Sequence, residues 1–316
     1  MASSICNLLL LLALQDGASG PQKVSGQILR PGIRKMDPVA RVWVVLHRVG
    51  PDAAAPLDSL QSDAAGRYSF TYARTGSDEA VYFVSASHNG IAYFTPPLHE
   101  HEVKGEEAEI TVFDTTSKRV PISVRGHHVV VSAVDGRAER LITEVFELSN
   151  DSSVTKVAAS EDAAGATWAT VMTAGGRDFT VSEGDFPSAA VKFGDGKVAL
   201  LAPIAPGIKQ VSFSYKMPAS AFPISLPITE LTGIYEVLIE EKTGGVSAPQ
   251  VKEVEAVTVD QRSFRRFLGN DLPRNSIAVI TLPAPKRAVH PGYLVGLTLV
   301  LGGAMIFALA RALKRG

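Results

Sequence analysis

Apolar and polar residues alternate along most of the chain with the period of two that predicts β-strands. In Arg41–His47 this alternation places three aliphatic residues on one face of the strand and the remaining side chains on the other. The first face holds Val42, Val44 and Leu46, and the second holds Trp43, Val45 and His47. Turn-forming residues follow most such segments at short intervals. The chain is therefore expected to be mainly β.

Six short strands are predicted within roughly the first ninety residues that follow the N-terminal segment. Asp63–Gly66 forms a turn, and Asn89–Gly90 supplies the positive φ angles that a tight hairpin requires. Short strands separated by such turns predict an antiparallel β-sandwich over residues 21–114. The predicted strands are Val24–Leu29, Arg41–His47, Arg67–Tyr72, Ala80–Ala86, Gly90–Phe94 and Glu107–Phe113.

Residues 115–284 repeat the β pattern, and we expect them to form a second, Ig-like sandwich. Within Arg140–Asn150, Leu141, Thr143, Val145 and Glu147 alternate with a second, more apolar set, as expected for a half-buried sandwich strand. The second set is Ile142, Glu144, Phe146 and Leu148. Gln261–Leu268 is predicted to form one or two helical turns. The predicted strands are Val120–Val124, His127–Val134, Leu141–Leu148, Gly176–Val181, Lys197–Ala202, Lys209–Tyr215, Gly233–Glu240, Val251–Val257 and Ser276–Leu282.

The order of motifs in residues 22–114 resembles that of carboxypeptidase regulatory-like domains. The motifs are Val24-x-Gly26-x-Ile28, the strand at Val42, Asp63-x-x-Gly66-Arg67-Tyr68-x-Phe70, and Tyr82-x-Val84 with Gly90 behind it. The resemblance implies a transthyretin-like β-sandwich in which Asp63 and Gly66 form a turn and the aromatic residues point inward. It implies little about activity, because such modules are joined to many unrelated proteins. Bacterial exported proteins have a similar order of parts.

Both ends of the chain carry the pattern of membrane targeting. Residues 1–20 resemble a cleavable signal peptide, with an apolar run over Ile5–Leu14 and small residues around a cut after Ser19. Tyr293–Ala310 carries no charge and, at ~1.5 Å per residue, spans roughly 27 Å of the ~30 Å hydrocarbon core. We therefore predict a transmembrane helix over 293–313 behind a proline-stiffened tether at 285–292, with a cytoplasmic tip at 314–316 and the bulk periplasmic or extracellular.

The net charge of −1 and the scattered basic residues exclude a nucleic-acid-binding footprint. The only cysteine, Cys6, lies in the predicted leader, so the mature chain would hold no disulfide framework and no thiolate site. His99 and His101 would share one face of an extended segment and could bind zinc or copper if His88 or a carboxylate completed the site. The alternative is that they lie in a solvated polar loop.

No nucleophile elbow, phosphate-binding glycine loop or zincin helix occurs in the sequence, so we do not expect an enzyme and expect no cofactor. We expect a non-catalytic, membrane-anchored extracytoplasmic binding or scaffold protein whose partner is another envelope protein or a surface polymer. One alternative is a membrane-tethered carbohydrate-binding protein that stacks sugar rings on exposed aromatic residues. A second alternative is a metal-dependent hydrolase or metal carrier that uses the two histidines. The candidate ligand-binding aromatic residues are Trp43, Tyr72, Tyr82 and Tyr93.

Overall fold

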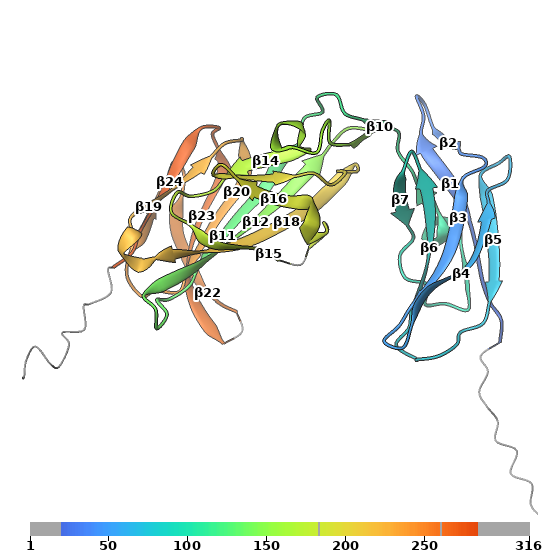
Figure 1. The fold of residues 1–316 in the computed structure, drawn as a ribbon, viewed down its shortest axis with the longest axis horizontal. Coiled ribbons are helices and arrows are strands. Elements are labelled where there is room, and N and C mark those ends of the chain that lie inside the picture. Colours follow the sequence, from blue (N-terminus) through green and yellow to red (C-terminus); the bar gives the residue numbers. More distant parts are fainter. Residues whose placement is uncertain (1–19, 183, 260, 284–316) are drawn as a thin grey trace, which may run out of the picture. The chain divides into compact units, whose positions relative to one another are not determined.

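The computed structural model of the protein describes residues 20–182, 184–259 and 261–283. The fold is mainly β, as the alternating pattern predicts, and its described helical segments are short 3-10 turns. The chain divides into two compact units (Figure 1). Unit 1 contains the described residues up to Ile122 together with Ser149–Trp168 and Leu200–Ile208. Unit 2 contains Ser123–Leu148, Ala169–Ala199 and the described residues from Lys209 onward.

Unit 1 contains two larger sheets that enclose one apolar core. In the first sheet, β1 pairs antiparallel with β2 and β5 and parallel with β8 and β9. The second sheet has the order β4-β3-β6-β7 and is antiparallel throughout (Figure 1, blue to teal). The strands are β1 (Gln22–Pro31), β2 (Met36–Pro38), β3 (Trp43–Val49), β4 (Ala54–Gln61), β5 (Arg67–Tyr72), β6 (Val81–His88), β7 (Ile91–Phe94), β8 (Glu102–Lys104), β9 (Ile110–Thr111), β10 (Thr115–Thr116) and β13 (Thr155–Lys156).

The inward residues of unit 1 are those that strand alternation assigns to the core. Val44 and Leu46 are at most 1% exposed, and they share the core with the inward aromatic residues of β5, Tyr68 and Phe70. The turn before β5 is held by Asp63, whose carboxylate accepts hydrogen bonds from two backbone N–H groups at 2.7 and 2.8 Å, and it includes a glycine with a positive φ of 73°. The predicted hairpin between β6 and β7 is confirmed, with Asn89 and Gly90 at its tip and both at positive φ.

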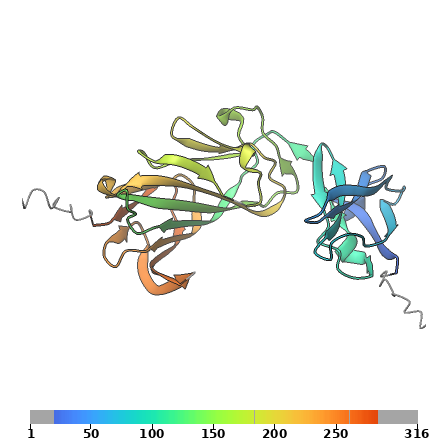
Figure 2. The ribbon, with the colours of Figure 1, turned by 60° about the horizontal axis from the view of Figure 1, so that its bottom comes forward.

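Unit 2 is built on a seven-stranded sheet of order β15-β18-β12-β11-β20-β23-β22 (Figure 2). Two three-stranded sheets, β14-β17-β16 and β19-β24-β21, complete the strands of the region. In the large sheet β11 and β20 are parallel, whereas β23 pairs antiparallel with β20 and β22. The strands are β11 (Ser123–Val131), β12 (Glu139–Asn150), β14 (Trp168–Val171), β15 (Arg177–Val181), β16 (Val191–Gly194), β17 (Lys197–Leu200), β18 (Gly207–Pro218), β19 (Ile224–Ile228), β20 (Thr232–Ile239), β21 (Gly245–Ser247), β22 (Lys252–Val259), β23 (Arg262–Leu272) and β24 (Ser276–Thr281). The 3-10 turns are η1 (Gly105–Ala108), η2 (Ala163–Gly165), η3 (Ser188–Ala190) and η4 (Ala219–Ala221).

The predicted helical turns at Gln261–Leu268 are wrong, because most of this segment belongs to strand β23. Phe264 and Phe267 are three residues apart, which is the spacing of a helical stripe. Both are buried, but β23 lies between β20 and β22 and takes its backbone hydrogen bonds from them. A bulge in β22 between Val254 and Val257 shifts the pairing at this point. Tertiary pairing therefore overrides the local spacing.

The described residues contain no helix that is both long enough and apolar enough to cross a membrane. The predicted span at 293–313 and its tether at 285–292 lie outside the described residues, as does the predicted signal peptide up to residue 19.

A buried polar triad lies in the core of unit 2. The carboxylate of Glu144 on β12 is 2.8 Å from His127 Nε2 on β11 and accepts a hydrogen bond of 2.8 Å from the hydroxyl of Tyr215 on β18. All three residues are at most 2% exposed. The ring of Phe146 stacks on His127 with centroids 3.9 Å apart, and burial raises the pKa of the Tyr215 hydroxyl. The triad joins three neighbouring strands inside an apolar core, where each polar group needs its partner.

We expect Glu144→Ala to lower the free energy of unfolding of unit 2 by about 3 kcal/mol or more, because it leaves two buried polar groups without their partner. The control is Glu147→Ala, which removes the same side chain from the partly exposed face of the same strand and should cost less than about 1 kcal/mol. Urea-induced unfolding of the purified protein measures both values. Equal losses in the two variants would contradict the structural role of the triad.

Candidate binding surface

The outer face of the sheet β4-β3-β6-β7 carries a group of exposed apolar side chains. Because inward residues alternate with outward ones, the burial of Val44 and Leu46 turns Trp43 and His47 away from the core. The large exposed apolar residues of these strands are Trp43 (56%), Val49 (44%), Leu57 (42%), Val81 (40%) and Phe94 (58%). Exposed apolar side chains gathered on one sheet face mark an interaction site more often than isolated ones do.

Strand register arranges the outward side chains in rows that cross the sheet. Trp43 lies opposite Gln61 on β4 and opposite Ser87 on β6, and Ser87 in turn lies opposite Ala92 on β7, so this row is uncharged and Trp43 has a polar neighbour on each side. In the next row Ser85 is the cross-strand partner of both Val45 and Phe94. We call this surface the aromatic face. Its residues are Trp43, Val45, His47, Val49, Ser59, Gln61, Val81, Phe83, Ser85, Ser87 and Phe94.

Three rings at the centre and edge of the aromatic face pack on one another. His47 stacks on Phe83 with ring centroids 5.0 Å apart, and Phe83 meets Phe94 edge-on at 5.8 Å. His47 Nε2 is also hydrogen-bonded to the hydroxyl of Ser85 at 2.8 Å. Burial lowers the pKa of the His47 imidazole below its usual range, which favours the neutral ring. The structure describes every outward position of these four strands. None of them holds an acidic or basic residue other than His47, which is neutral, so these positions carry no formal charge at neutral pH.

A small hollow adjoins the exposed edge of the aromatic face. It has a volume of about 260 Å³ and is lined by Phe83, Phe94, Thr95 and Pro97. The hydroxyl of Thr95 accepts a hydrogen bond of 3.0 Å from the backbone N–H of Val84, so Thr95 is fixed to β6. The hollow offers room for one apolar group of a ligand beside Phe94.

The predicted aromatic residues divide into one exposed ring and three buried ones. Trp43 lies on the aromatic face, whereas Tyr72, Tyr82 and Tyr93 are at most 8% exposed and belong to the core of unit 1. Tyr72 stacks on Tyr82 with centroids 5.3 Å apart, and the hydroxyl of Tyr93 is bonded to Thr155 at 2.9 Å. These buried rings are not accessible to a ligand.

The sequence pattern placed His47 on the same strand face as Trp43, but it did not identify Phe83 or Phe94 as members of this surface. The structure buries Tyr82 and Val84 and thereby turns Phe83 outward, whereas the sequence-based prediction took Tyr82 itself for an exposed ligand-binding residue. Nothing in the local pattern indicated that Phe94, on the edge strand β7, would stand beside Phe83.

His99 and His101 are both exposed and follow Pro97 outside any strand. His88, which was considered as a further ligand, is instead 3.1 Å from a carboxylate oxygen of Asp114. That contact, together with Arg30, lowers the pKa of Asp114. Among the residues that the structure describes, no group of three or more histidine, cysteine or acidic side chains could hold a metal ion. The structure therefore places no further ligand beside the two histidines.

The outer face of the large sheet in unit 2 has the opposite chemistry, because charged side chains are paired across its strands. His128 on β11 lies 2.8 Å from Glu236 on β20 through Nδ1 and 3.8 Å from Glu147 on β12 through Nε2. Glu236 is held on its other side by Arg266 on β23 at 2.5 Å. This ladder of alternating charges is a solvated, self-neutralising surface, and the strands that carry it also expose Leu141 and Ile234.

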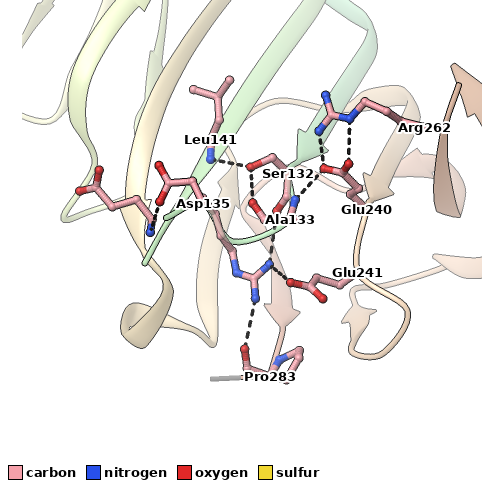
Figure 3. A network of polar contacts seen from close by, with 10 residues as sticks. Ser132, Ala133, Asp135, Leu141, Glu240, Glu241, Arg262 and Pro283 are labelled. Atoms are coloured by element: carbon pink, nitrogen blue, oxygen red, sulfur yellow. Dashed lines mark hydrogen bonds and ion pairs between the residues drawn. The ribbon is translucent and has the colours of Figure 1, made fainter. Parts of the chain in front are cut away.

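A second polar network fixes the last described residues of unit 2 (Figure 3). Arg140, whose side chain is fully buried, donates hydrogen bonds to Glu241 at 2.6 Å and to the backbone carbonyl of Pro283 at 3.2 Å. Its guanidinium also lies 5.4 Å from the ring centre of Phe222. Glu240 accepts a backbone hydrogen bond from Ala133 at 2.7 Å. The network ties the end of β24 to the large sheet.

Comparison with models of known protein families finds no match for this chain, and comparison with curated proteins finds none either. The geometry of the described residues is therefore the basis for a functional assignment. Its most distinctive surface is the uncharged aromatic face of unit 1.

The charge ladder of unit 2 should make stability depend on pH. Burial works against the ionised form of Glu236, but hydrogen bonds from His128 and Arg266 outweigh it and hold the pKa of Glu236 below the 4.5 that is ordinary for glutamate. The pKa of Glu236 is lower in the folded state than in the unfolded state. The ionised Glu236 side chain therefore contributes fully to stability at pH values above its unfolded-state pKa, and this contribution is lost as the pH falls through its folded-state pKa. Glu236→Gln should lower the free energy of unfolding by about 1–2 kcal/mol at pH 7, and the difference should shrink below about pH 4.5.

Urea unfolding of both proteins between pH 3 and pH 7 measures this difference. Glu255→Gln, at an exposed position on β22, is the control and should change the unfolding free energy little at any pH. If the loss of unfolding free energy caused by Glu236→Gln stays constant down to pH 3, ionised Glu236 does not stabilise the fold.

Proposed function

We propose that the protein is a non-catalytic, membrane-anchored binding protein that presents the aromatic face of unit 1 to a ligand outside the cytoplasm. The observation that carries this proposal is the group of large apolar side chains left exposed on one uncharged sheet face. Such a surface costs solubility, so its presence on folded strands is best explained by a partner that covers it. The partner would be an envelope protein or a surface polymer.

The location is supported by the two ends of the sequence. The apolar run and small residues within 1–20 support export, and the uncharged stretch within 293–313 supports a single membrane span with the C-terminus in the cytoplasm. We also infer that unit 1 is a transthyretin-like domain of the carboxypeptidase regulatory-like kind, followed by an Ig-like domain. The inward aromatic residues of β5 and the turn at Asp63 are consistent with that resemblance.

The proposal that the protein is not an enzyme rests on how far a substrate could reach the acidic and basic side chains of the described residues. The best acid–base constellation, Glu144 with His127 and Tyr215, is at most 2% exposed, so a substrate would have no route to it. His99 and His101 carry the alternative of a metal-dependent hydrolase or metal carrier. Metal analysis of protein purified without a histidine tag tests that alternative, and one equivalent of zinc or copper per chain would favour it over the binding role.

The alternative of a carbohydrate-binding protein has a specific observation in its favour. Trp43 is 56% exposed and lies between Gln61 and Ser87, so an aromatic platform stands beside uncharged hydrogen-bonding groups. That combination suits the apolar ring faces and the hydroxyl groups of a sugar.

The membrane proposal predicts that the full chain sediments with membranes and is released by detergent but not by alkaline carbonate or high salt. A chain that ends at residue 284 should be recovered in the soluble exported fraction, because it lacks the 293–313 stretch. Fractionation followed by immunoblotting measures both. Recovery of the full chain from the cytosol without detergent would contradict the proposal.

The binding proposal predicts a contact at the aromatic face in the intact cell. A photo-crosslinking amino acid placed at Phe94, which is 58% exposed, should yield a higher-mass adduct after irradiation. The matched control is the same amino acid at Ile277 on β24, which is 54% exposed and lies in unit 2. Equal adduct formation at both positions, or none at Phe94, would count against a ligand on this face.

A further inference from the structure

The aromatic face has two chemically different ends. One end combines the two most exposed rings, Trp43 and Phe94, with the hydroxyl and amide side chains of Ser87 and Gln61. The other end is aliphatic, with Val49 opposite Val81. A ligand that needs both ring stacking and uncharged hydrogen bonds fits the first end and not the second.

Charge narrows the ligand class. The outward positions of β3, β4, β6 and β7 carry no Asp, Glu, Lys or Arg, so an ionic ligand would lose its hydration without gaining a counter-charge. The outer face of the large sheet in unit 2, by contrast, carries paired charges such as His128 with Glu236. The two sheets therefore differ in the ligands they can accept, and the aromatic face suits an uncharged one.

The size of the face also restricts the occupant. A full grid of four strands at ~4.8 Å and four rows at ~6.8 Å would measure roughly 14 by 20 Å, so the aromatic face, to which β7 contributes two rows only, covers at most about 300 Å². A stable protein dimer buries about 800 Å² on each partner. The aromatic face is thus too small to hold a second copy of this chain by itself, but it is large enough for several sugar rings.

The two exposed rings lie a fixed distance apart. Phe94 is two strands and one row away from Trp43, so ideal sheet spacing separates their backbone positions, rather than the rings themselves, by roughly 12 Å. Ser85 and Ser87 lie on β6, between the strands that carry the two rings. Ser85 is 8% exposed and bonded to His47, so Ser87 is the accessible serine of the two. A chain molecule with alternating apolar faces and hydroxyl groups fits both rings and Ser87.

We propose that the ligand of the aromatic face is an uncharged polysaccharide, bound across β3, β6 and β7. Sugar rings stack on Trp43 and Phe94, while Ser87 and Gln61 exchange hydrogen bonds with its hydroxyl groups. This inference rests on the proposed binding function and names its ligand class.

Tryptophan fluorescence provides a direct readout, because the chain has two tryptophans and only one is on this face. Trp168 is 7% exposed, so Trp168→Phe leaves Trp43 as the reporter. The full chain, solubilised in a detergent without a sugar headgroup, is titrated with cellohexaose, maltohexaose and xylohexaose. At least one should shift the Trp43 emission with a dissociation constant below about 10 mM, and an acidic hexagalacturonate should not.

Matched variants locate the binding site. Phe94→Ala should weaken binding of the responding oligosaccharide at least about tenfold, because one stacking ring is lost. Val49→Ser with Val81→Ser, at the aliphatic end, should change it less than about twofold. A calorimetric titration confirms the affinities independently of fluorescence.

The inference is overturned if none of the neutral oligosaccharides binds, if the acidic one binds equally well, or if the aliphatic-end variant loses as much affinity as Phe94→Ala. These failures differ from failure of the proposed function. If the photo-crosslinker at position 94 still captures a protein while the sugars fail, the binding role stands and the polysaccharide is excluded. If it captures nothing and the sugars fail, both fall.

Discussion

The structure of unit 1 depends on one constraint, which is that successive side chains of a strand must point to opposite faces while one face closes over the core. The apolar set at Val42, Val44 and Leu46 is drawn inward to meet Tyr68 and Phe70 of the opposing sheet. A shift of one residue would expose that set and bury His47. Because the inward set is the more apolar, the register is fixed, and Trp43 is exposed as a direct consequence.

The stability of unit 2 depends on a different constraint. Polar side chains that are buried in its core and at its edges need hydrogen-bond partners. Glu144 is tolerated inside the sandwich because His127 and Tyr215 occupy both of its oxygens. Arg140 is tolerated because Glu241 and two backbone carbonyls accept hydrogen bonds from its two terminal nitrogens, whereas its buried Nε has no partner. These groups specify the pairing of distant strands, and they are used up in doing so. Their role is structural, and the exposed rings Trp43 and Phe94 lie in unit 1 instead.

The aromatic face is built on paired strands rather than on a loop. Its side chains are positioned by cross-strand hydrogen bonds, so their spacing is set before a ligand arrives. The strand β3 is fixed further by Arg48, whose buried guanidinium binds both carboxylate oxygens of Asp52 at 2.7 and 2.8 Å and the backbone carbonyl of Thr75. A preorganised, uncharged surface of modest area favours weak and reversible binding.

The sequence alone determined the β class, most of the strands and the inward faces of β3, β5 and β12, because alternation is a local property that each segment carries in itself. It also indicated the tight turn at Asn89–Gly90 through the backbone freedom of those residues. Only the tertiary structure decided that Gln261–Leu268 is a central strand, that Tyr72, Tyr82 and Tyr93 are core residues, and that Phe83 and Phe94 join Trp43 on one surface. Those outcomes depend on which strands become neighbours, and strand pairing is set by contacts between segments far apart in the chain, which no local pattern records.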